Sequence, residues 1–354
     1  MGKSYNILIL GASYGSLLGT KLVLAGHNVT MVCLPHEAEL FNGEGAVVRM
    51  PIRGRDGLVE VRSKGAPGKL AACGTDVNPA EFDLVGLAMQ EPQYRSPGVR
   101  ELMARVAAAG VPCMSIMNMP PLPYLKRLPG VDAARLRHCY ADPAVWDAFD
   151  PALMTLASPD PQAFRPPEEP VNVLQVSLPT NFKVAQFEDA AHTAMLRELE
   201  AGIDAVRFPT PEGPVELPVK LKVHDSVYVP LAKWAMLLTG NYRCVTADDA
   251  RAIREAVHSD LAESEAVYDW VTQLCVTLGA EAADMVPFAK YANAARGLAK
   301  PSSAARALDA GAANVERVDL LVQSLARQKG MQNAAVDETV ALVDGRLETN
   351  RKAA

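Results

Sequence analysis

The sequence is poor in cysteine and contains no long hydrophobic run. Its six cysteines among 354 residues are scattered singly, with no C-x-x-C pair and no cluster of histidines beside them. This spacing argues against a disulfide framework and against a metal site, so we expect buried free thiols in a reducing cytoplasm. No window reaches the roughly 18 apolar residues of a membrane span, and the apolar run at residues 7–10 is too short for a signal-peptide core.

An excess of charge of one sign is also lacking. Lys and Arg number 35 against 41 Asp and Glu, which gives a formal net charge of −6. Without a Lys/Arg-rich run the chain has no positively charged segment that would bind nucleic acid or an anionic membrane, and we expect neither partner. With 49% hydrophobic and 21% charged residues, the composition is that of a folded globular protein. The length favours two domains.

The first part of the chain alternates between strand-like and helical segments. The pattern predicts strands at residues 6–10, 28–32, 83–89 and 112–117, and helices at residues 16–25 and 99–109. The strands are apolar on both faces, which is typical of a parallel sheet covered by helices on two sides. We therefore predict an α/β domain of the doubly wound, Rossmann type.

Proline interrupts the middle of the chain. Twelve of the 26 prolines fall between Pro120 and Pro179, so we interpret residues 119–180 as an irregular insertion in the first domain. Near and beyond its end the pattern predicts a strand at residues 171–176, a helix at residues 189–201 closed by Gly202, and a strand at residues 204–208. Four prolines and a glycine then mark residues 209–218 as a linker.

Beyond about residue 223 the pattern is helical to the end. Apolar residues recur at three- and four-residue spacings in residues 228–238, 247–278, 302–329 and 335–347. The predicted organisation is a Rossmann-type domain at residues 1–218 followed by an all-α domain at residues 219–354.

A glycine-bearing turn joins the first predicted strand to the first predicted helix. Such a turn lets backbone N–H groups and the positive helix end meet a pyrophosphate. The spacing is one residue shorter than G-x-G-x-x-G, and Ser13 stands where a middle glycine is usual. We predict that the turn binds a dinucleotide through Gly11, Ala12, Ser13, Tyr14, Gly15 and Ser16; the alternative is a tight turn with a purely structural role.

The end of the second predicted strand does not reveal the cofactor's 2′ group. An acidic residue there would accept a hydrogen bond from a ribose 2′-OH, and Arg or Lys would pair with a 2′-phosphate. The residues after this strand begin with Cys33-Leu34-Pro35, so neither an acidic nor a basic residue directly follows the strand. His36 could contact a phosphate or could be a solvated loop residue.

Several segments, in order along the chain, resemble the ketopantoate reductase (2-dehydropantoate 2-reductase) family. The opening at residues 15–30 is similar to the start of that family, and Asn118 ends a strand as the family's active-site asparagine does. The helix that contains Lys233 resembles the one with the catalytic lysine. Pro301-Ser302-Ser303 and the residues around 329–339 follow the family's closing pattern, and the resemblance fades over residues 120–180.

The resemblance implies hydride transfer from NADPH, with NADH as the alternative, to the keto carbon of a 2-oxo acid. Lys233 would be the general acid, in a cleft between the domains, Asn118 would orient the substrate or the nicotinamide, and Ser302 or Ser303 would hold the carboxylate. An ammonium group near the carbonyl oxygen would both polarise it and supply a proton.

The chain also departs from the family pattern. Two asparagines usually follow the lysine on the same helix face. Here Leu237 replaces the first and Asn241 keeps the second, so one polar contact is lost. Gln90 matches a lysine of the family. The C-terminal catalytic glutamate aligns with Val315, and Glu316 stands beside it. These differences favour a divergent relative with another substrate.

Each candidate residue could also have a purely structural role. Lys233 could extend into solvent from an amphipathic helix, and Asn118 could be a turn former. Ser302 could be a helix N-cap. Glu316 could lie on the solvated face of a helix.

Two other functions remain alternatives. His224-Asp225 is the best support for an opine-type dehydrogenase, which joins an amino acid to a 2-oxo acid. A nicotinamide-nucleotide sensor without catalytic activity is the second. The expected partner is a small molecule, and the sequence leaves a homodimer open.

Overall fold

The computed structural model describes residues 3–353, which divide into two compact units. The first unit comprises the chain up to Met89, Gln93–Met117 and Val145–Asp225, and the second comprises Gln90–Pro92, Asn118–Ala144 and the chain from Ser226 onward. This division differs from a boundary at residue 218. Residues 118–144, the first part of the proline-rich segment, belong to the second unit, and residues 219–225 belong to the first.

Eight strands form the main sheet of the first unit, in the order β12-β11-β8-β7-β6-β1-β2-β5. Their bounds are β1 Asn6–Leu10, β2 Asn28–Val32, β5 Leu70–Cys73, β6 Leu84–Leu87, β7 Cys113–Ile116, β8 Met154–Ser158, β11 Phe182–Ala185 and β12 Leu221–His224. All neighbours from β8 to β5 are parallel, and β11 runs antiparallel to β8. The predicted α/β class with a largely parallel sheet is confirmed.

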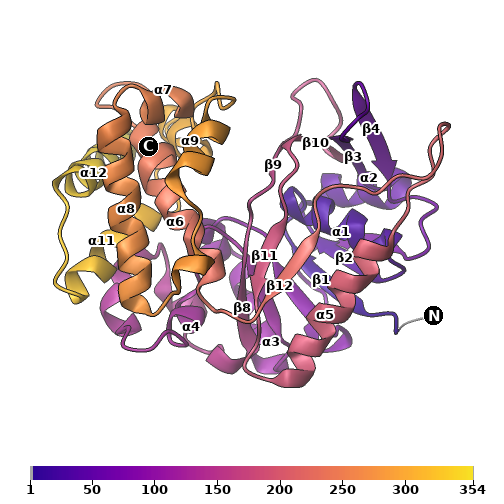
Figure 1. Cartoon of the computed structure of the whole chain (residues 1–354). Helices are drawn as coiled ribbons and strands as arrows, with labels where there is room; N and C mark the ends of the chain where they lie inside the picture. The colour runs from indigo at the N-terminus through magenta and orange to yellow at the C-terminus, as the bar shows by residue number, and fades with distance from the viewer. Residues whose placement is uncertain (1–2, 354) are drawn as a thin grey trace. The chain divides into compact units, whose positions relative to one another are not determined.

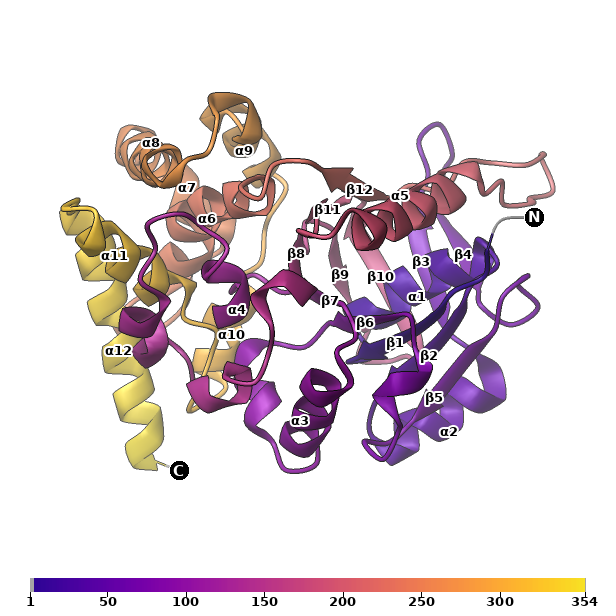
Figure 2. The ribbon, with the colours of Figure 1, turned by 90° about the horizontal axis from the view of Figure 1, so that it is seen from below.

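Helices cover both faces of this sheet, as expected for apolar strands. They are α1 Tyr14–Leu24, α2 Pro35–Glu44, α3 Val99–Ala109 and α5 Ala190–Ala205. Figure 2 shows α5 and α3 on opposite sides of the sheet. Gly19 lets α1 approach closely, because a Cβ at this position would lie 3.3 Å from Val29 of β2. The doubly wound arrangement is therefore confirmed.

A second, smaller sheet belongs to the same unit. Its order is β4-β3-β10-β9, with bounds β3 Val47–Pro51, β4 Leu58–Arg62, β9 Gln162–Phe164 and β10 Val173–Leu178, and the four strands lie together in Figure 1. The pattern predicted only the strand at residues 171–176, which is β10. The proline-rich segment is thus less irregular than expected, since it contributes β8, β9 and β10 to the two sheets.

Two local predictions around α5 are wrong. Helix α5 does not close at Gly202 but continues to Ala205, and a Cβ at Gly202 would lie 3.4 Å from Ala25 and from His27. The glycine therefore serves close packing instead of ending the helix. The predicted strand at residues 204–208 is absent, because α5 occupies its start and only a single bridge joins Phe208 to Val215. The last strand of the sheet is β12.

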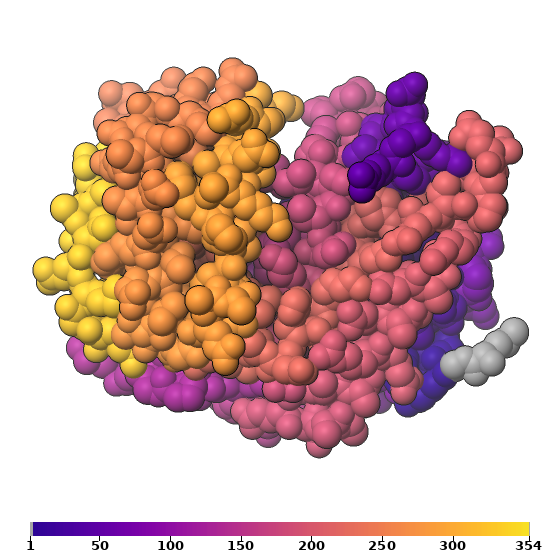
Figure 3. Space-filling view, viewed as in Figure 1, coloured from indigo at the N-terminus to yellow at the C-terminus, as the bar shows by residue number. Residues whose placement is uncertain are grey.

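The second unit is helical, as predicted. Its helices are α4 Leu122–Leu125, α6 Lys233–Met236, α7 Ile253–His258, α8 Leu261–Leu278, α9 Phe288–Ala295, α10 Ser303–Asp309, α11 Val318–Gln328 and α12 Ala334–Ala353. Residues of α8 and α9, in orange, form much of one surface of this unit (Figure 3). Reciprocal hydrogen bonds of 3.1 and 3.0 Å between Asp132 and the Gln328 side chain hold part of the proline-rich segment against α11.

Candidate functional site

The turn between β1 and α1 accepts no side chain at its first glycine. Gly11 has φ +102°, and a Cβ there would lie 2.7 Å from the carbonyl oxygen of Ala88. The backbone N–H of Gly11 donates to the carbonyl of Val32, over 3.0 Å. The turn is therefore pinned to the residues that end β2 and follow β6, and glycine satisfies both the backbone conformation and the space.

The next residues of the turn begin helix α1. Ser13 is the N-cap, but its side chain caps none of the first-turn amides. Its carbonyl instead accepts the hydroxyl of Ser16 at 2.8 Å, and the hydroxyl of Tyr14 donates to the carbonyl of Pro161 at 2.8 Å. A Cβ on Gly15 would lie 2.7 Å from the Ile9 side chain. Ala12 is buried, so the turn is compact and glycine-dependent, as a phosphate-binding turn requires.

The segment after β2 contains more charge than the sequence pattern indicated. His36 is exposed and lies in the first turn of helix α2, not in a loop. Glu37 is buried, and its carboxylate accepts the backbone N–H of Leu34 at 3.2 Å. The same carboxylate pairs with Arg165, which follows β9. Sequence reasoning missed this pair because 128 positions separate its members.

In the second unit, Asn118 and Glu316 lie together although they are far apart in sequence. The Asn118 side-chain amide donates to the Glu316 carboxylate at 3.2 Å. The backbone N–H of Glu91 donates to the other carboxylate oxygen at 3.3 Å. The side-chain oxygen of Asn118 is buried and has no hydrogen-bond partner among the described residues. Glu316 is therefore held from two sides beside an amide that can accept one further hydrogen bond.

Glu316 does not lie on a solvated helix face. It is 7% exposed and precedes α11 in a segment without regular secondary structure. Burial raises the pKa of Glu316 to about 7, against the opposing effects of the Asn118 and Glu91 hydrogen bonds and of the Lys233 charge. Glu316 is thus a buried carboxylate with a raised pKa, and its burial was invisible in the local sequence.

Lys233 begins helix α6 and is half-buried. Its positive charge acts on the Glu316 carboxylate and favours the ionised form of that group. Lys233, Asn118 and Glu316 thus form an electrostatically linked set of an ammonium, an amide and a carboxylate. Such a set can hold a polar substrate group and supply a proton.

The remaining candidates of the second unit differ in accessibility. Ser302 is buried, and its hydroxyl donates to the Asn241 carbonyl at 2.7 Å and accepts the Ala305 N–H at 3.1 Å. It is therefore the N-cap of α10. Ser303 and Gln90 are exposed, and Asn241 is half-buried at the end of a π-helical turn.

His224 and Asp225 lie at and directly after the end of strand β12. The Asp225 carboxylate accepts a hydrogen bond from Arg197 at 2.8 Å and is largely exposed. His224 is the last residue of β12. This engagement of Asp225 weakens the opine-type alternative, which depends on a histidine activated by that carboxylate.

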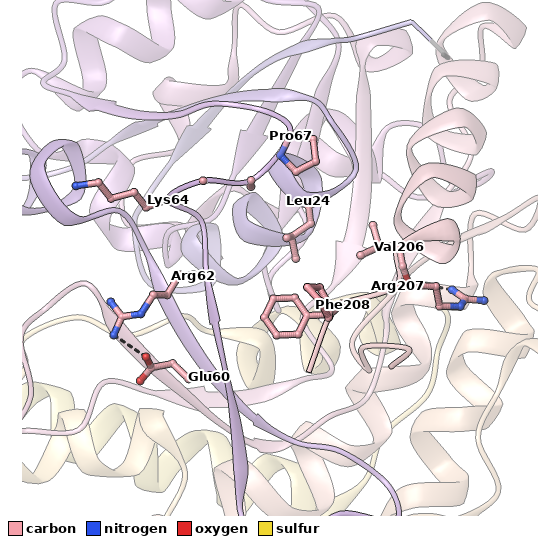
Figure 4. A pocket seen from close by; sticks show the side chains of 11 residues that line it. Leu24, Glu60, Arg62, Lys64, Pro67, Val206, Arg207 and Phe208 are labelled. Carbon is pink, nitrogen blue, oxygen red and sulfur yellow. Dashed lines mark hydrogen bonds and ion pairs between the residues drawn. The ribbon is translucent and has the colours of Figure 1, made fainter. Parts of the chain in front are cut away.

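A cavity of about 450 Å³ in the first unit lies away from the turn between β1 and α1. Its lining includes Leu24 at the end of α1, Phe208 and Pro67, together with Arg62 and Lys64 (Figure 4). Because Leu24 is the last residue of the helix whose first residue follows the turn, this cavity and the turn are at opposite ends of α1. We therefore do not assign the dinucleotide to it.

The six cysteines are free thiols, as predicted, although Cys33 and Cys73 are only partly buried. Within residues 3–353, no three His, Cys, Asp or Glu side chains are grouped so as to hold a metal ion. None of the helices described in that range has the length and apolarity of a membrane span.

The fold defines a class: a Rossmann-type α/β unit joined to an all-α unit. No protein-family model and no curated protein sequence matches the chain significantly, but solved structures do. 2-Dehydropantoate 2-reductase from Methylococcus capsulatus is 13% identical, with coverage of 99% of this chain and 98% of that one and a TM-score of 0.63. The PanE/ApbA family ketopantoate reductase from Ralstonia eutropha JMP134 is 14% identical, with coverage of 98% and 99% and a TM-score of 0.60.

D-mandelate dehydrogenase, solved as a ternary structure with NADH and anilino(oxo)acetate, is a further match. It is 12% identical, with coverage of 98% of this chain and 99% of that one and a TM-score of 0.61. These likenesses extend over the whole chain, and they confirm that the chain has the fold of ketopantoate reductases at low sequence identity.

Proposed function

We propose that this protein is an NAD(P)H-dependent oxidoreductase that reduces a 2-oxo acid to a 2-hydroxy acid. The observation that carries the proposal is the hydrogen bond between Asn118 and buried Glu316 under the charge of Lys233. The names of the matched structures, 2-dehydropantoate 2-reductases and a D-mandelate dehydrogenase with NADH, support the same reaction class. A bound nicotinamide would supply the hydride that adds to the keto carbon.

The residues of the first unit fit a dinucleotide. Position 11 exposes only backbone, since a Cβ there would lie 2.7 Å from the carbonyl oxygen of Ala88. The N-cap Ser13 leaves the first-turn amides of α1 without a side-chain cap, so these amides can face a pyrophosphate. Gly11, Ala12, Ser13 and Gly15 would bind the pyrophosphate through their backbone, and Tyr14 and Ser16 would hold the turn in shape.

The second unit would supply the proton and position the substrate. Lys233 would polarise the carbonyl oxygen and protonate the alkoxide that forms as the hydride adds. The free carbonyl oxygen of Asn118 would accept a hydrogen bond from the substrate or the nicotinamide amide, while Glu316 holds the Asn118 side chain.

The substrate carboxylate would lie near the start of α10. Because the Ser302 hydroxyl already binds the Asn241 carbonyl and the Ala305 N–H, exposed Ser303 is the better candidate of the two. Gln90 and Asn241 would contribute polar contacts at the edge of the site. Asn241 keeps an asparagine of the family pattern, whereas Gln90 replaces a lysine and Leu237 replaces the other asparagine. These two replacements favour a 2-oxo acid other than ketopantoate.

A binding and turnover experiment tests the proposal. We expect NADPH or NADH fluorescence to report saturable binding to the wild-type protein, and loss of the reduced-nicotinamide absorbance when a panel of 2-oxo acids is added. Binding without oxidation by any of the acids would favour the sensor. A requirement for an amino acid as co-substrate would favour the opine-type enzyme, and absence of binding would overturn the whole proposal.

A further inference from the structure

The end of strand β2 contains an ion pair that local sequence did not reveal. Glu37, in the first turn of α2, is 8% exposed, and its carboxylate pairs with the guanidinium of Arg165. The side chain of Arg165 is 27% exposed. Both residues belong to the first unit, and both influence the thiol of Cys33, the residue directly after β2. The pair therefore lies at the carboxyl end of this strand.

The two members of the pair are not equally satisfied. Both Glu37 oxygens are used, one by the Leu34 N–H at 3.2 Å and the other by Arg165. On Arg165 the second terminal nitrogen, Nη2, is buried and has no hydrogen-bond partner among the described residues. A buried guanidinium donor without an acceptor is unfavourable, because an arginine nitrogen always carries its protons. The site therefore lacks an acceptor.

The position indicates which acceptor would satisfy it. In Rossmann-type folds the adenosine ribose of the dinucleotide lies at the end of the second strand. A carboxylate there binds the 2′-OH of NADH, and an arginine binds the 2′-phosphate of NADPH. Here the carboxylate is already occupied, and the group with spare donors is the guanidinium. The arrangement favours a phosphate.

We propose that Arg165 determines cofactor specificity by binding the 2′-phosphate of NADPH, and that Glu37 is a positioning residue that orients the guanidinium. This inference rests on the proposed function, since it requires a dinucleotide on the turn between β1 and α1. It assigns the cofactor's 2′ group to a residue that lies after β9, in the proline-rich segment, and not to the residues that directly follow β2.

The test compares affinities for NADPH and NADH by fluorescence titration. We expect the wild-type protein to prefer NADPH. The substitution Arg165→Ala should weaken NADPH binding by about 10- to 100-fold, the range for a charge-assisted contact, and leave NADH binding within about threefold. Arg165→Lys should restore part of the preference because it keeps the charge but loses the fork of donors.

Glu37→Gln tests the positioning role. It should weaken NADPH binding by less than Arg165→Ala, because the guanidinium remains but is no longer fixed. Arg49→Ala is the matched control, since Arg49 also forms ion pairs with carboxylates at 29% exposure in the same unit. This control should leave the ratio of the two affinities unchanged, and retained NADH binding shows that each variant is folded.

The outcomes separate the two claims. If the wild type binds neither nucleotide, the proposed function fails. If it binds NADPH and NADH but Arg165→Ala does not change their ratio, only the assignment of Arg165 fails. A wild-type preference for NADH would also overturn the assignment, because Glu37 would then be the residue that contacts the ribose.

Discussion

Each unit buries an ionisable side chain whose pKa moves to about 7, Lys21 in the first and Glu316 in the second. Burial is the main cause in both cases. Lys21 is 1% exposed on α1, and its ammonium donates to the carbonyls of Leu217 and Pro218 at 3.3 and 3.0 Å. Glu316 is 7% exposed and accepts hydrogen bonds from Asn118 and the Glu91 backbone.

The hydrogen-bond partners distinguish Lys21, a structural group, from Glu316, for which we propose a functional role. The Lys21 hydrogen bonds end on backbone carbonyls of the segment before β12 and tie that segment to α1. The Glu316 hydrogen bonds involve a side chain, Asn118, that keeps an unused acceptor, and a nearby charge, that of Lys233. Perturbed pKa values gather at functional sites but also arise in structural networks. In this protein the kind of hydrogen-bond partner, not the size of the pKa shift, separates Lys21 from Glu316.

The largest expected effect concerns Lys21. Its folded-state pKa is lowered to about 7 from 10.5, so between these values the unfolded chain holds a proton that the native state lacks. The free energy of unfolding should therefore rise with pH in this window for the wild type relative to Lys21→Met, by as much as about 4 kcal/mol between pH 7 and pH 10. Urea denaturation at a series of pH values measures this difference. A flat difference would show that the ammonium is not desolvated.

Glu316 should show the opposite pH dependence. Its folded-state pKa is raised from 4.5 to about 7, so the native state holds the extra proton between these values, and stability falls as pH rises through them. Glu316→Gln should therefore stabilise the protein by about 3 kcal/mol above pH 7 and by almost nothing near pH 4. The same variant should lose reductase activity. A variant that gains stability and keeps full activity would place Glu316 with Lys21 as a structural group.

Lys233 tests the functional side of the comparison. Lys233→Ala should lower kcat for 2-oxo acid reduction by about 100-fold or more if Lys233 is the proton donor. It should leave nucleotide affinity nearly unchanged. The control is Lys290→Ala on the exposed side of α9, which should behave like the wild type. Steady-state kinetics with the best substrate of the panel makes the measurement, and an unchanged rate in Lys233→Ala removes the proposed mechanism.

The smallest expected effect concerns Ser302. Like Lys21 it binds a backbone carbonyl, that of Asn241, and it also caps α10. Ser302→Ala should therefore lower the free energy of unfolding by about 1 kcal/mol, the usual contribution of an N-cap. KM should change little if Ser303 holds the substrate carboxylate, and Ser303→Ala should raise KM with little change in stability. The reverse pattern of KM changes would assign the carboxylate contact to Ser302.

Local sequence predicted those parts of the fold that depend on neighbours in the chain. The strands at residues 6–10 and 28–32, helix α3 and the helical second unit are set by apolar periodicity, and the structure confirms them. The helix end at Gly202 and the strand at residues 204–208 were wrong. In both cases packing overrode local preference, since Gly202 provides close contact between α5 and the residues after α1.

The residues of the candidate site also fall into those that local sequence indicates and those that depend on distant parts of the chain. Gly11 and Gly15 were recognisable because a turn of this kind uses consecutive residues, and family resemblance pointed to Asn118 and Lys233. The local pattern favoured an exposed Glu316, and it held no sign of the pair between Glu37 and Arg165. Such groups acquire their environment from residues a hundred or more positions away.

The amino-acid sequence by itself determined a parallel α/β unit with a glycine turn after its first strand, followed by helices. Hydrophobic periodicity and glycine's backbone freedom act over a few residues, which is why they can be read locally. Only the tertiary structure decided that Glu316 is buried against Asn118, that Lys21 is a structural cation and that Arg165 stands at the end of β2. Burial and charge pairing are properties of three-dimensional neighbours, and the fold alone brings those neighbours together.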